Sequence, residues 1–236
     1  MIEIASFCMQ GKNKLNQDAI LHLKLDDIYL FAIADGMGGE LGGNIASNFS
    51  LNIVQEVFLD KSHISIKEIF EKVSNRLKNL SKVMSKYEKM ATTLTICIIR
   101  DNIAYVGHVG DCRIYHLRDK GIMRRTKDQT EVQKLLDDKI LTKSLAKNYH
   151  RKNILLSVMS SSIEYKLQEN QFKLVNKDRL LLLSDGVYNV IDNKILIRDI
   201  SLKSSNIKDF SINFLKEIES KRVKDDYSCI SIQFNQ

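Results

Sequence analysis

Two Asp-Gly pairs in this sequence each follow a short apolar run. Residues 28–34 lead into Asp35-Gly36, and a second run that starts at Leu180 leads into Asp185-Gly186. Glycine lets the backbone turn sharply, which would leave a carbonyl oxygen exposed beside the Asp carboxylate. Carboxylate and carbonyl oxygens are the ligands that Mg²⁺ and Mn²⁺ prefer. A single Asp-Gly pair is more often a simple turn, so the metal interpretation depends on further acids elsewhere in the chain.

Those further acids stand at the ends of other apolar runs. Asp111 follows the run 103–109, Asp225 and Asp226 precede the run 229–234, and Asp18 precedes the run 19–23. Several carboxylates that come together repel one another unless cations neutralise them. The sequence therefore predicts a cluster of divalent ions at the ends of several strands.

The elements that must position these acids follow from the periodicity of the apolar residues. Apolar residues spaced by three and four predict helices near 45–57, 66–80 and 207–218, and a short helix is expected at 130–138. Strands that are grouped together, with helices in separate blocks, favour a layered α+β domain over a parallel βαβ fold. Strand-like runs lie near residues 2–8, 19–24, 28–34, 93–99, 103–109, 112–117, 171–175, 180–184 and 228–234.

The composition fits a globular protein of the cytoplasm. The chain has 236 residues, 44% of them hydrophobic, which is enough for one large core or two small ones. No stretch approaches the ~18 apolar residues of a membrane span, and the N-terminus lacks the pattern of a secretory signal. The four cysteines are scattered without the C-x-x-C spacing of a zinc site, which favours a reducing compartment.

Nearly all of the excess positive charge lies in one segment. The net charge is +7, and residues 118–152 contain 11 Lys or Arg and 5 Asp or Glu. The segment is either a solvated Lys-rich surface or a surface that attracts an anionic partner such as a phosphorylated protein. A nucleic-acid partner is not favoured, because few aromatic residues are available to stack on bases.

Taken in order, the motifs resemble those of the metal-dependent protein phosphatases, the type 2C Ser/Thr phosphatases. Met37 and the short length are similar to the bacterial branch of that family. The ordered set covers almost the whole chain, whereas each motif alone is weak. The matching pieces are Asn16-Gln17-Asp18, Asp35-Gly36-Met37-Gly38-Gly39, Ala91-Thr92-Thr93, Val109-Gly110-Asp111-Cys112-Arg113, Ser184-Asp185-Gly186 and Asp225-Asp226-Tyr227-Ser228.

The resemblance implies a single domain over residues 1–236, built as a four-layer α-β-β-α sandwich of two antiparallel sheets flanked by helix pairs. A flap subdomain is implied at about 118–165. The resemblance also implies a centre of two Mn²⁺ or Mg²⁺ ions, with Asp35 as the bridging ligand and the Gly36 carbonyl on one ion.

By the same resemblance, Asp185 and Asp225 complete the other ion. Asp18 holds a metal-bound water, and Asp111 joins Asp185 at a third, weaker ion. Two departures from the family pattern leave alternatives open. Asn13 stands where the family usually has an Arg that grips the substrate phosphate, so Lys12 or Lys14 could supply charge instead. Asp226 could compete with Asp225 as the ligand.

The activity implied is hydrolysis of phosphoserine and phosphothreonine on proteins by a metal-activated water. The partners implied are phosphorylated substrates of a Ser/Thr kinase, with no nucleic acid and no membrane, and a monomer is expected. The alternative is a catalytically weak or inactive relative that binds phosphoproteins. A P-loop is not expected, because the chain has no G-x-x-x-x-G-K-[ST] sequence.

Overall fold

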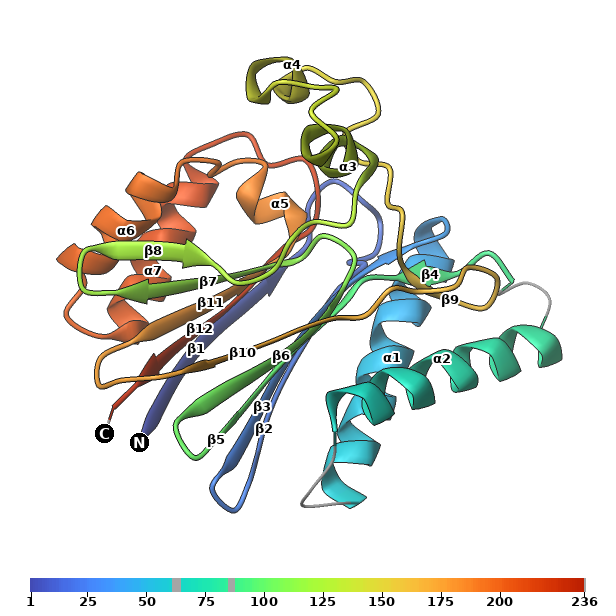
Figure 1. Cartoon of the computed structure of the whole chain (residues 1–236), viewed down its shortest axis with the longest axis horizontal. Helices are drawn as coiled ribbons and strands as arrows, with labels where there is room; N and C mark the ends of the chain where they lie inside the picture. Colours follow the sequence, from blue (N-terminus) through green and yellow to red (C-terminus); the bar gives the residue numbers. More distant parts are fainter. Residues whose placement is uncertain (61–64, 85–87, 236) are drawn as a thin grey trace.

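Two antiparallel β-sheets pack face to face, and helices cover their outer sides (Figure 1). The structure is a computed structural model, and it describes residues 1–60, 65–84 and 88–235. The first sheet has five strands in the order β1-β12-β11-β7-β8, and each neighbouring pair is antiparallel. Its strands are β1 (Ile2–Met9), β7 (Arg113–Arg118), β8 (Gly121–Arg124), β11 (Arg179–Leu183) and β12 (Tyr227–Phe234).

The second sheet has seven strands in the order β10-β6-β5-β3-β4-β9, with β2 paired to β3. Its pairings are also antiparallel. Its strands are β2 (Asp18–Leu25), β3 (Ile28–Met37), β4 (Ala91–Thr92), β5 (Leu94–Arg100), β6 (Ile103–Val109), β9 (Met159–Ser160) and β10 (Gln168–Lys173).

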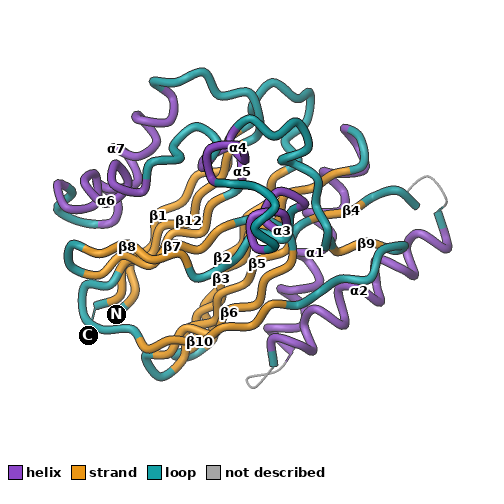
Figure 2. Tube along the Cα trace, turned by 45° about the horizontal axis from the view of Figure 1, so that its top comes forward, coloured by secondary structure: helices purple, strands orange, loops and turns teal. Residues whose placement is uncertain are grey.

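The helices divide between the two outer faces and one end of the molecule. Helices α1 (Glu40–Asp60) and α2 (Ile66–Val83) cover the second sheet, and α6 (Lys194–Lys203) and α7 (Ile207–Glu219) cover the first (Figure 1). Figures 1 and 2 place three short helices over the same end of the sheets. They are α3 (Glu131–Asp137), α4 (Lys143–Lys147) and α5 (Asp185–Tyr188).

Alternating side chains of β3 fill two different cores. Phe31 and Ile33 are buried between the two sheets, whereas Leu30, Ala32 and Ala34 are buried against the helices α1 and α2. A strand of period two sends successive side chains to opposite faces of its sheet. Residues 28–34 of this strand are therefore apolar throughout because both faces of the strand are covered.

Strand β11 has the same arrangement in the first sheet. Leu180 and Leu182 lie in the core between the sheets, and Leu181 and Leu183 lie in the outer core with Phe210 of α7. The three cores separate four layers in the order helix, sheet, sheet, helix. The predicted four-layer α+β sandwich of antiparallel sheets is confirmed.

The long strands and the helices α1, α2, α3 and α7 overlap the predicted positions. The sequence analysis did not predict the short strands β4, β8 and β9 or the helices α4, α5 and α6. At Asp185 the structure corrects the expected turn, because β11 ends at Leu183 and Asp185-Gly186 opens helix α5.

No helix in the described part of the chain is both long enough and apolar enough to cross a membrane.

Candidate active site

Five acidic side chains reach one end of the sandwich from five different elements. Asp18 is the first residue of β2, Asp35 lies near the end of β3, and Asp111 follows β6. Asp185 opens α5, and Asp225 precedes β12. The carboxylates of Asp18, Asp111, Asp185 and Asp225 all act electrostatically on Asp35. The structure therefore brings together the predicted acidic residues, which are up to 207 positions apart in the sequence.

Asp18 and Asp35 are direct partners in the pairing of β2 with β3. Partners in an antiparallel pair carry their side chains on the same face of the sheet, so the two carboxylates share one face. The Ser184 hydroxyl donates to Asp18 Oδ2 at 2.6 Å, and the Ser228 N–H donates to the Ser184 hydroxyl at 2.9 Å. Ser184 thus links Asp18 to the segments that carry Asp185 and Asp225.

The backbone around Asp35 is held by Thr92 and Thr93. The Asp35 N–H donates to Thr93 Oγ1 at 2.9 Å, and the Asp35 carbonyl accepts from the Thr93 N–H and from the Thr92 hydroxyl at 2.8 and 3.0 Å. A Cβ at Gly36 would lie 1.9 Å from the carbonyl oxygen of Gly43 in α1. Glycine is therefore required at position 36 because α1 begins against this part of β3.

Asp111 and Asp185 are oriented by two neighbouring residues at the end of α5. The Tyr188 hydroxyl donates to Asp111 Oδ2 at 2.8 Å, and the Asn189 amide donates to Asp185 Oδ2 at 3.1 Å. The Arg113 guanidinium stacks on the Tyr188 ring, 3.5 Å from its centroid. These hydrogen bonds favour the ionised carboxylates.

The adjacent Asp225 and Asp226 differ in their surroundings. Asp226 is buried, and its carboxylate accepts from the Gly11 and Gln17 N–H groups at 2.7 and 2.8 Å and from Asn13 Nδ2 at 3.1 Å. Asp225 is exposed, and its Oδ1 accepts from the Asp226 N–H at 3.0 Å and from Asn13 Nδ2 at 3.4 Å. The Asp226 carboxylate thus holds the β1–β2 loop against the segment before β12, whereas the Asp225 side chain stays accessible.

The carboxylates at this end have raised pKa values. Burial and the neighbouring acids raise the pKa of Asp18 to about 7 and that of Asp35 well above its ordinary value. The pKa of Asp111 rises to about 6 and that of Asp185 well above its ordinary range, again chiefly through burial. A cation among these groups would restore their charged forms, because opposite charge favours ionisation.

The donor set fits Mg²⁺ or Mn²⁺ because it consists of oxygen atoms. In the part of the chain that the structure describes, no group of three or more His, Cys, Asp or Glu side chains is arranged to hold an ion by itself. The Gly36 carbonyl and water would have to supply the remaining ligands, and Mg²⁺ usually keeps several waters. The Cys112 thiol is buried beside Thr93 Oγ1 at 3.3 Å, and burial raises its pKa well above the ordinary value.

The predicted phosphate-binding residues lie on the loop between β1 and β2. The Asn13 amide is directed at Asp225 and Asp226, and the side chains of Lys12 and Lys14 are exposed. The residues that sequence reasoning did not single out are Tyr188 and Asn189. Their spacing of three and four from Asp185 was the available signal, because such residues lie on one side of a helix.

Comparison with known proteins identifies a family over most of the chain. The model of the protein phosphatase 2C family matches residues 9–217. Protein phosphatase PhpP of Streptococcus pneumoniae is 31% identical over 196 residues, which are 80% of this chain and 79% of that protein. The serine/threonine phosphatase stp of Listeria welshimeri is 26% identical over 89% of this chain and 86% of its own length.

Solved structures share the fold. Serine/threonine phosphatase Stp1 from Staphylococcus aureus matches with a TM-score of 0.92 and 22% identity, over 100% of this chain and 96% of that chain. The catalytic domain of the phosphatase PstP, solved in complex with two manganese ions, matches with a TM-score of 0.86 and 22% identity, over 100% and 99% of the two chains. The acids in their predicted order, the four-layer sandwich and the match over residues 9–217 lead to one conclusion: the chain belongs to the protein phosphatase 2C family of metal-dependent serine/threonine phosphatases.

Proposed function

We propose that this protein removes phosphate from phosphoserine and phosphothreonine residues of other proteins, with Asp35, the Gly36 carbonyl, Asp185 and Asp225 as ligands of two Mn²⁺ or Mg²⁺ ions. The observation that carries the proposal is the convergence of five carboxylates from five elements at one end of a phosphatase fold. Asp18 orients a water ligand from a buried position, and Asp111 joins Asp185 at a third, weaker ion.

The chain's own residues set the geometry of this centre. The other four acids all act electrostatically on Asp35, and Thr92 and Thr93 fix its backbone. Ser184, Tyr188 and Asn189 direct single carboxylate oxygens through hydrogen bonds of 2.6 to 3.1 Å. Bound divalent cations lower the pKa of water and neutralise charge on a transferring phosphoryl group. A cysteine nucleophile has no part in the proposal, because the Cys112 thiol is buried and burial raises its pKa well above the ordinary value.

The segment 118–165 is proposed to be the flap subdomain that receives the phosphorylated substrate. It carries α3 and α4 above the acidic end of the sandwich (Figure 1). The Arg151 guanidinium pairs with Glu131 at 2.7 Å, and the Tyr149 hydroxyl donates to Glu131 at 2.6 Å. These contacts join the residues after α4 to the start of α3 within the segment.

The substrates proposed are proteins phosphorylated by a Ser/Thr kinase, and no nucleic-acid or membrane partner is proposed. A cytoplasmic location is proposed because it fits the four free cysteines, since free thiols persist in reducing compartments. The protein is further proposed to be a monomer with one domain over residues 1–236. The inactive alternative has no support, because the matched relatives are named phosphatases. Lys12 and Lys14 are proposed to attract the substrate phosphate from their exposed positions.

The decisive experiment measures Mn²⁺-dependent hydrolysis of p-nitrophenyl phosphate and of a phosphothreonine peptide, with EDTA as the metal-free control. We expect turnover that EDTA abolishes. Asp35→Asn should reduce kcat by on the order of a thousandfold, since one of the charges that hold the cations is lost. Asp27→Asn is the matched control, because Asp27 is exposed between β2 and β3. Near-normal turnover by Asp35→Asn at saturating Mn²⁺ would contradict the site.

A further inference from the structure

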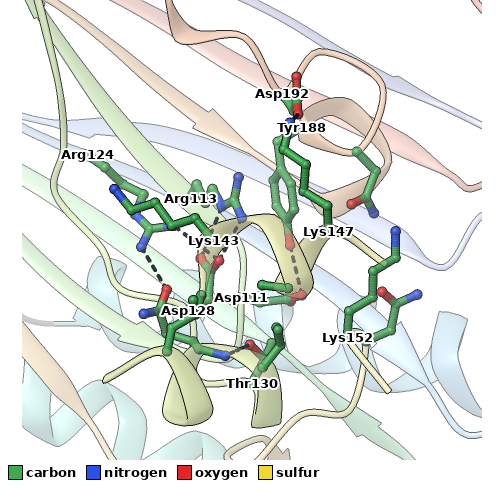
Figure 3. Close-up of a pocket in the computed structure, with 16 residues that line it drawn as sticks. Asp111, Arg113, Arg124, Asp128, Thr130, Lys143, Lys147, Lys152, Tyr188 and Asp192 are labelled. Atoms are coloured by element: carbon green, nitrogen blue, oxygen red, sulfur yellow. Dashed lines mark hydrogen bonds and ion pairs between the residues drawn. The ribbon is translucent and has the colours of Figure 1, made fainter. Parts of the chain in front are cut away.

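A cavity of about 340 Å³ lies directly beside the acidic centre, between the flap and α5 (Figure 3). Asp111, Tyr188 and Asn189 form part of its wall. Tyr188 hydrogen-bonds Asp111, and Asn189 hydrogen-bonds Asp185. When the phosphate of a substrate lies at Asp111 and Asp185, the residues next to the phosphorylated residue in the substrate therefore lie over the cavity.

Five basic side chains surround the cavity. Figure 3 shows Arg113, Arg124 and Lys143 on one side of Asp111 and Lys147 and Lys152 on the other. The three lysines come from the flap, whereas Arg113 comes from β7. The cavity thus collects positive charge from both the flap and the sheet.

The acids of the same wall already have partners. Asp128 accepts from Arg113 at 2.7 Å and from Arg124 at 3.1 Å, and Asp192 pairs with Lys147 at 3.4 Å. Asp111 accepts from Tyr188.

Two of the lysines differ from the other basic residues. Among the described residues, no carboxylate oxygen lies within 4.0 Å of the ammonium group of Lys143 or Lys152. Both side chains are exposed and line the cavity. The cavity therefore has two cationic groups available to an anion.

We propose that this cavity binds a second phosphorylated residue of the substrate, close in sequence to the residue that is dephosphorylated. A phosphate group carries a charge of about −1.5 to −2 and three acceptor oxygens. It therefore complements the two unpaired ammonium groups better than a carboxylate, which carries a single charge, would. At about 340 Å³ the cavity has room for a phosphorylated side chain. The inference rests on the proposed function and adds a preference for substrates phosphorylated at more than one position.

The test uses phosphothreonine peptides with a second group placed two to five residues away on either side. One peptide series carries a phosphonate there, which cannot be hydrolysed, and parallel series carry glutamate or alanine. We expect the best phosphonate peptide to exceed its alanine counterpart about tenfold in kcat/KM, since hydrogen bonds to charged groups are the strong ones. The glutamate peptides should exceed the alanine peptides in kcat/KM by a smaller factor.

In the double variant Lys143→Gln/Lys152→Gln, kcat/KM for the phosphonate peptide divided by kcat/KM for the alanine peptide should be close to one. The matched control is Lys208→Gln/Lys216→Gln, which removes the same charge from exposed positions of α7 and should keep the wild-type ratio. Equal kcat/KM for all three peptide series, or an equal loss in both double variants, would overturn the inference. A glutamate gain as large as the phosphonate gain would also overturn it.

Hydrolysis of p-nitrophenyl phosphate by the wild-type protein separates the two proposals. Mn²⁺-dependent turnover without any phosphonate preference means that the cavity assignment fails while the activity stands. Absence of turnover on every substrate means that the proposed function itself fails.

Discussion

Single carboxylates at this site differ because of the groups that surround each of them. Asp226 accepts three hydrogen bonds in a buried position, and its neighbour Asp225 is exposed. Asp111 and Asp185 each receive one donor from the end of α5. The role of each acid therefore depends on its partners more than on its residue type.

Substitution of Asp225 should affect the metal requirement, whereas substitution of Asp226 should affect stability. Asp225→Asn should keep the stability of the protein and raise the Mn²⁺ concentration needed for half-maximal activity about tenfold or more. Asp226→Asn should instead lower the free energy of unfolding by about 2 kcal/mol, because an amide NH₂ group replaces one carboxylate oxygen and then faces backbone N–H donors. Metal titrations and urea unfolding of both variants separate the effects. A larger metal defect in Asp226→Asn would reverse the assignment.

The Tyr188 hydroxyl supports the ionised form of Asp111, so Tyr188→Phe should weaken the binding of the proposed third ion. The packing of the ring is kept and only the donor is lost. We expect about a tenfold higher Mn²⁺ requirement, since a hydrogen bond to a charged group contributes roughly 1.5–3 kcal/mol. Activity should return at high Mn²⁺. Tyr29→Phe, on the remote part of β3, is the control and should behave as wild type. An unchanged Mn²⁺ titration for Tyr188→Phe would refute the role.

The elements act by bringing loops to one end of the sandwich. The loop between β1 and β2 is fixed to the segment before β12 through Asp226, and the Lys12 N–H donates to the Lys224 carbonyl at 3.1 Å. The residues before α3 are fixed to the end of β6, because Gln129 exchanges hydrogen bonds of 2.8 and 2.9 Å with Gly110. Loops thus become parts of the site through hydrogen bonds to segments that are distant in the sequence.

The β1–β2 loop offers a direct test of phosphate recognition. Asn13→Arg should lower KM for a phosphothreonine peptide about tenfold and leave kcat within a few fold, because a guanidinium adds a bidentate donor for phosphate. Steady-state kinetics at saturating Mn²⁺ give both constants. If Lys12 and Lys14 already bind the phosphate, Asn13→Arg changes little and Lys12→Ala or Lys14→Ala raises KM instead. Unchanged KM in all three variants would place the phosphate-binding group elsewhere.

His108 links β6 to β5 and to the residues before α3. Its ring nitrogens lie 2.8 Å from Thr95 Oγ1 and 3.2 Å from the Lys127 carbonyl, and burial lowers its pKa to about 4. Because the unfolded chain takes up a proton near pH 6.5 and the folded chain does not, this residue lowers stability as the pH falls from about 6.5 to 4. The loss at pH 5 is about 2 kcal/mol.

His108→Gln should therefore lose less stability than wild type between pH 7.5 and pH 5. Urea unfolding in EDTA at both pH values measures the difference, and His22→Gln at an exposed position of β2 is the matched control. An equal pH-dependent loss in wild type and His108→Gln would show that His108 is charged in the folded state.

At the scale of the whole molecule, the sandwich tolerates a repulsive centre at one end. Three cores hold the layers together, and the acids of the centre raise one another's pKa values. Folding thus brings these charges together at a cost that bound cations would offset. The acids that would hold the cations therefore lower the stability of the metal-free protein.

The repulsion predicts that Asp35→Asn stabilises the metal-free protein while it abolishes activity. Removal of one buried, mutually repelling carboxylate should raise the free energy of unfolding by about 1 kcal/mol, or the Tm by roughly 2–4 °C for a domain of this size. Thermal unfolding in EDTA measures the change, and Asp27→Asn should show none. Addition of Mn²⁺ should raise the Tm of wild type more than that of Asp35→Asn. A lower Tm of Asp35→Asn in EDTA would show that the acids do not destabilise the fold.

The sequence by itself indicated a layered α+β domain and the set of acids, and the resemblance to a family implied the four layers. Runs such as 28–34 and 180–183 are apolar throughout because both faces of their strands are covered, and the Asp residues stand at the ends of such runs. The short elements β4, β8, β9, α4, α5 and α6 could not be predicted. Segments of two to five residues, and a helix such as α6 with only Ile197 fully buried, carry too little periodicity.

Only the tertiary structure decided how the acids differ. Two neighbouring Asp residues are equivalent in the sequence, and the hydrogen bonds to Asp226 come from groups more than 200 positions away. The same holds for the cavity between the flap and α5, whose basic residues are scattered from Arg113 to Lys152. Side-chain environment is a property of the packed chain, because hydrogen bonds and charge pairs depend on which segments meet after folding.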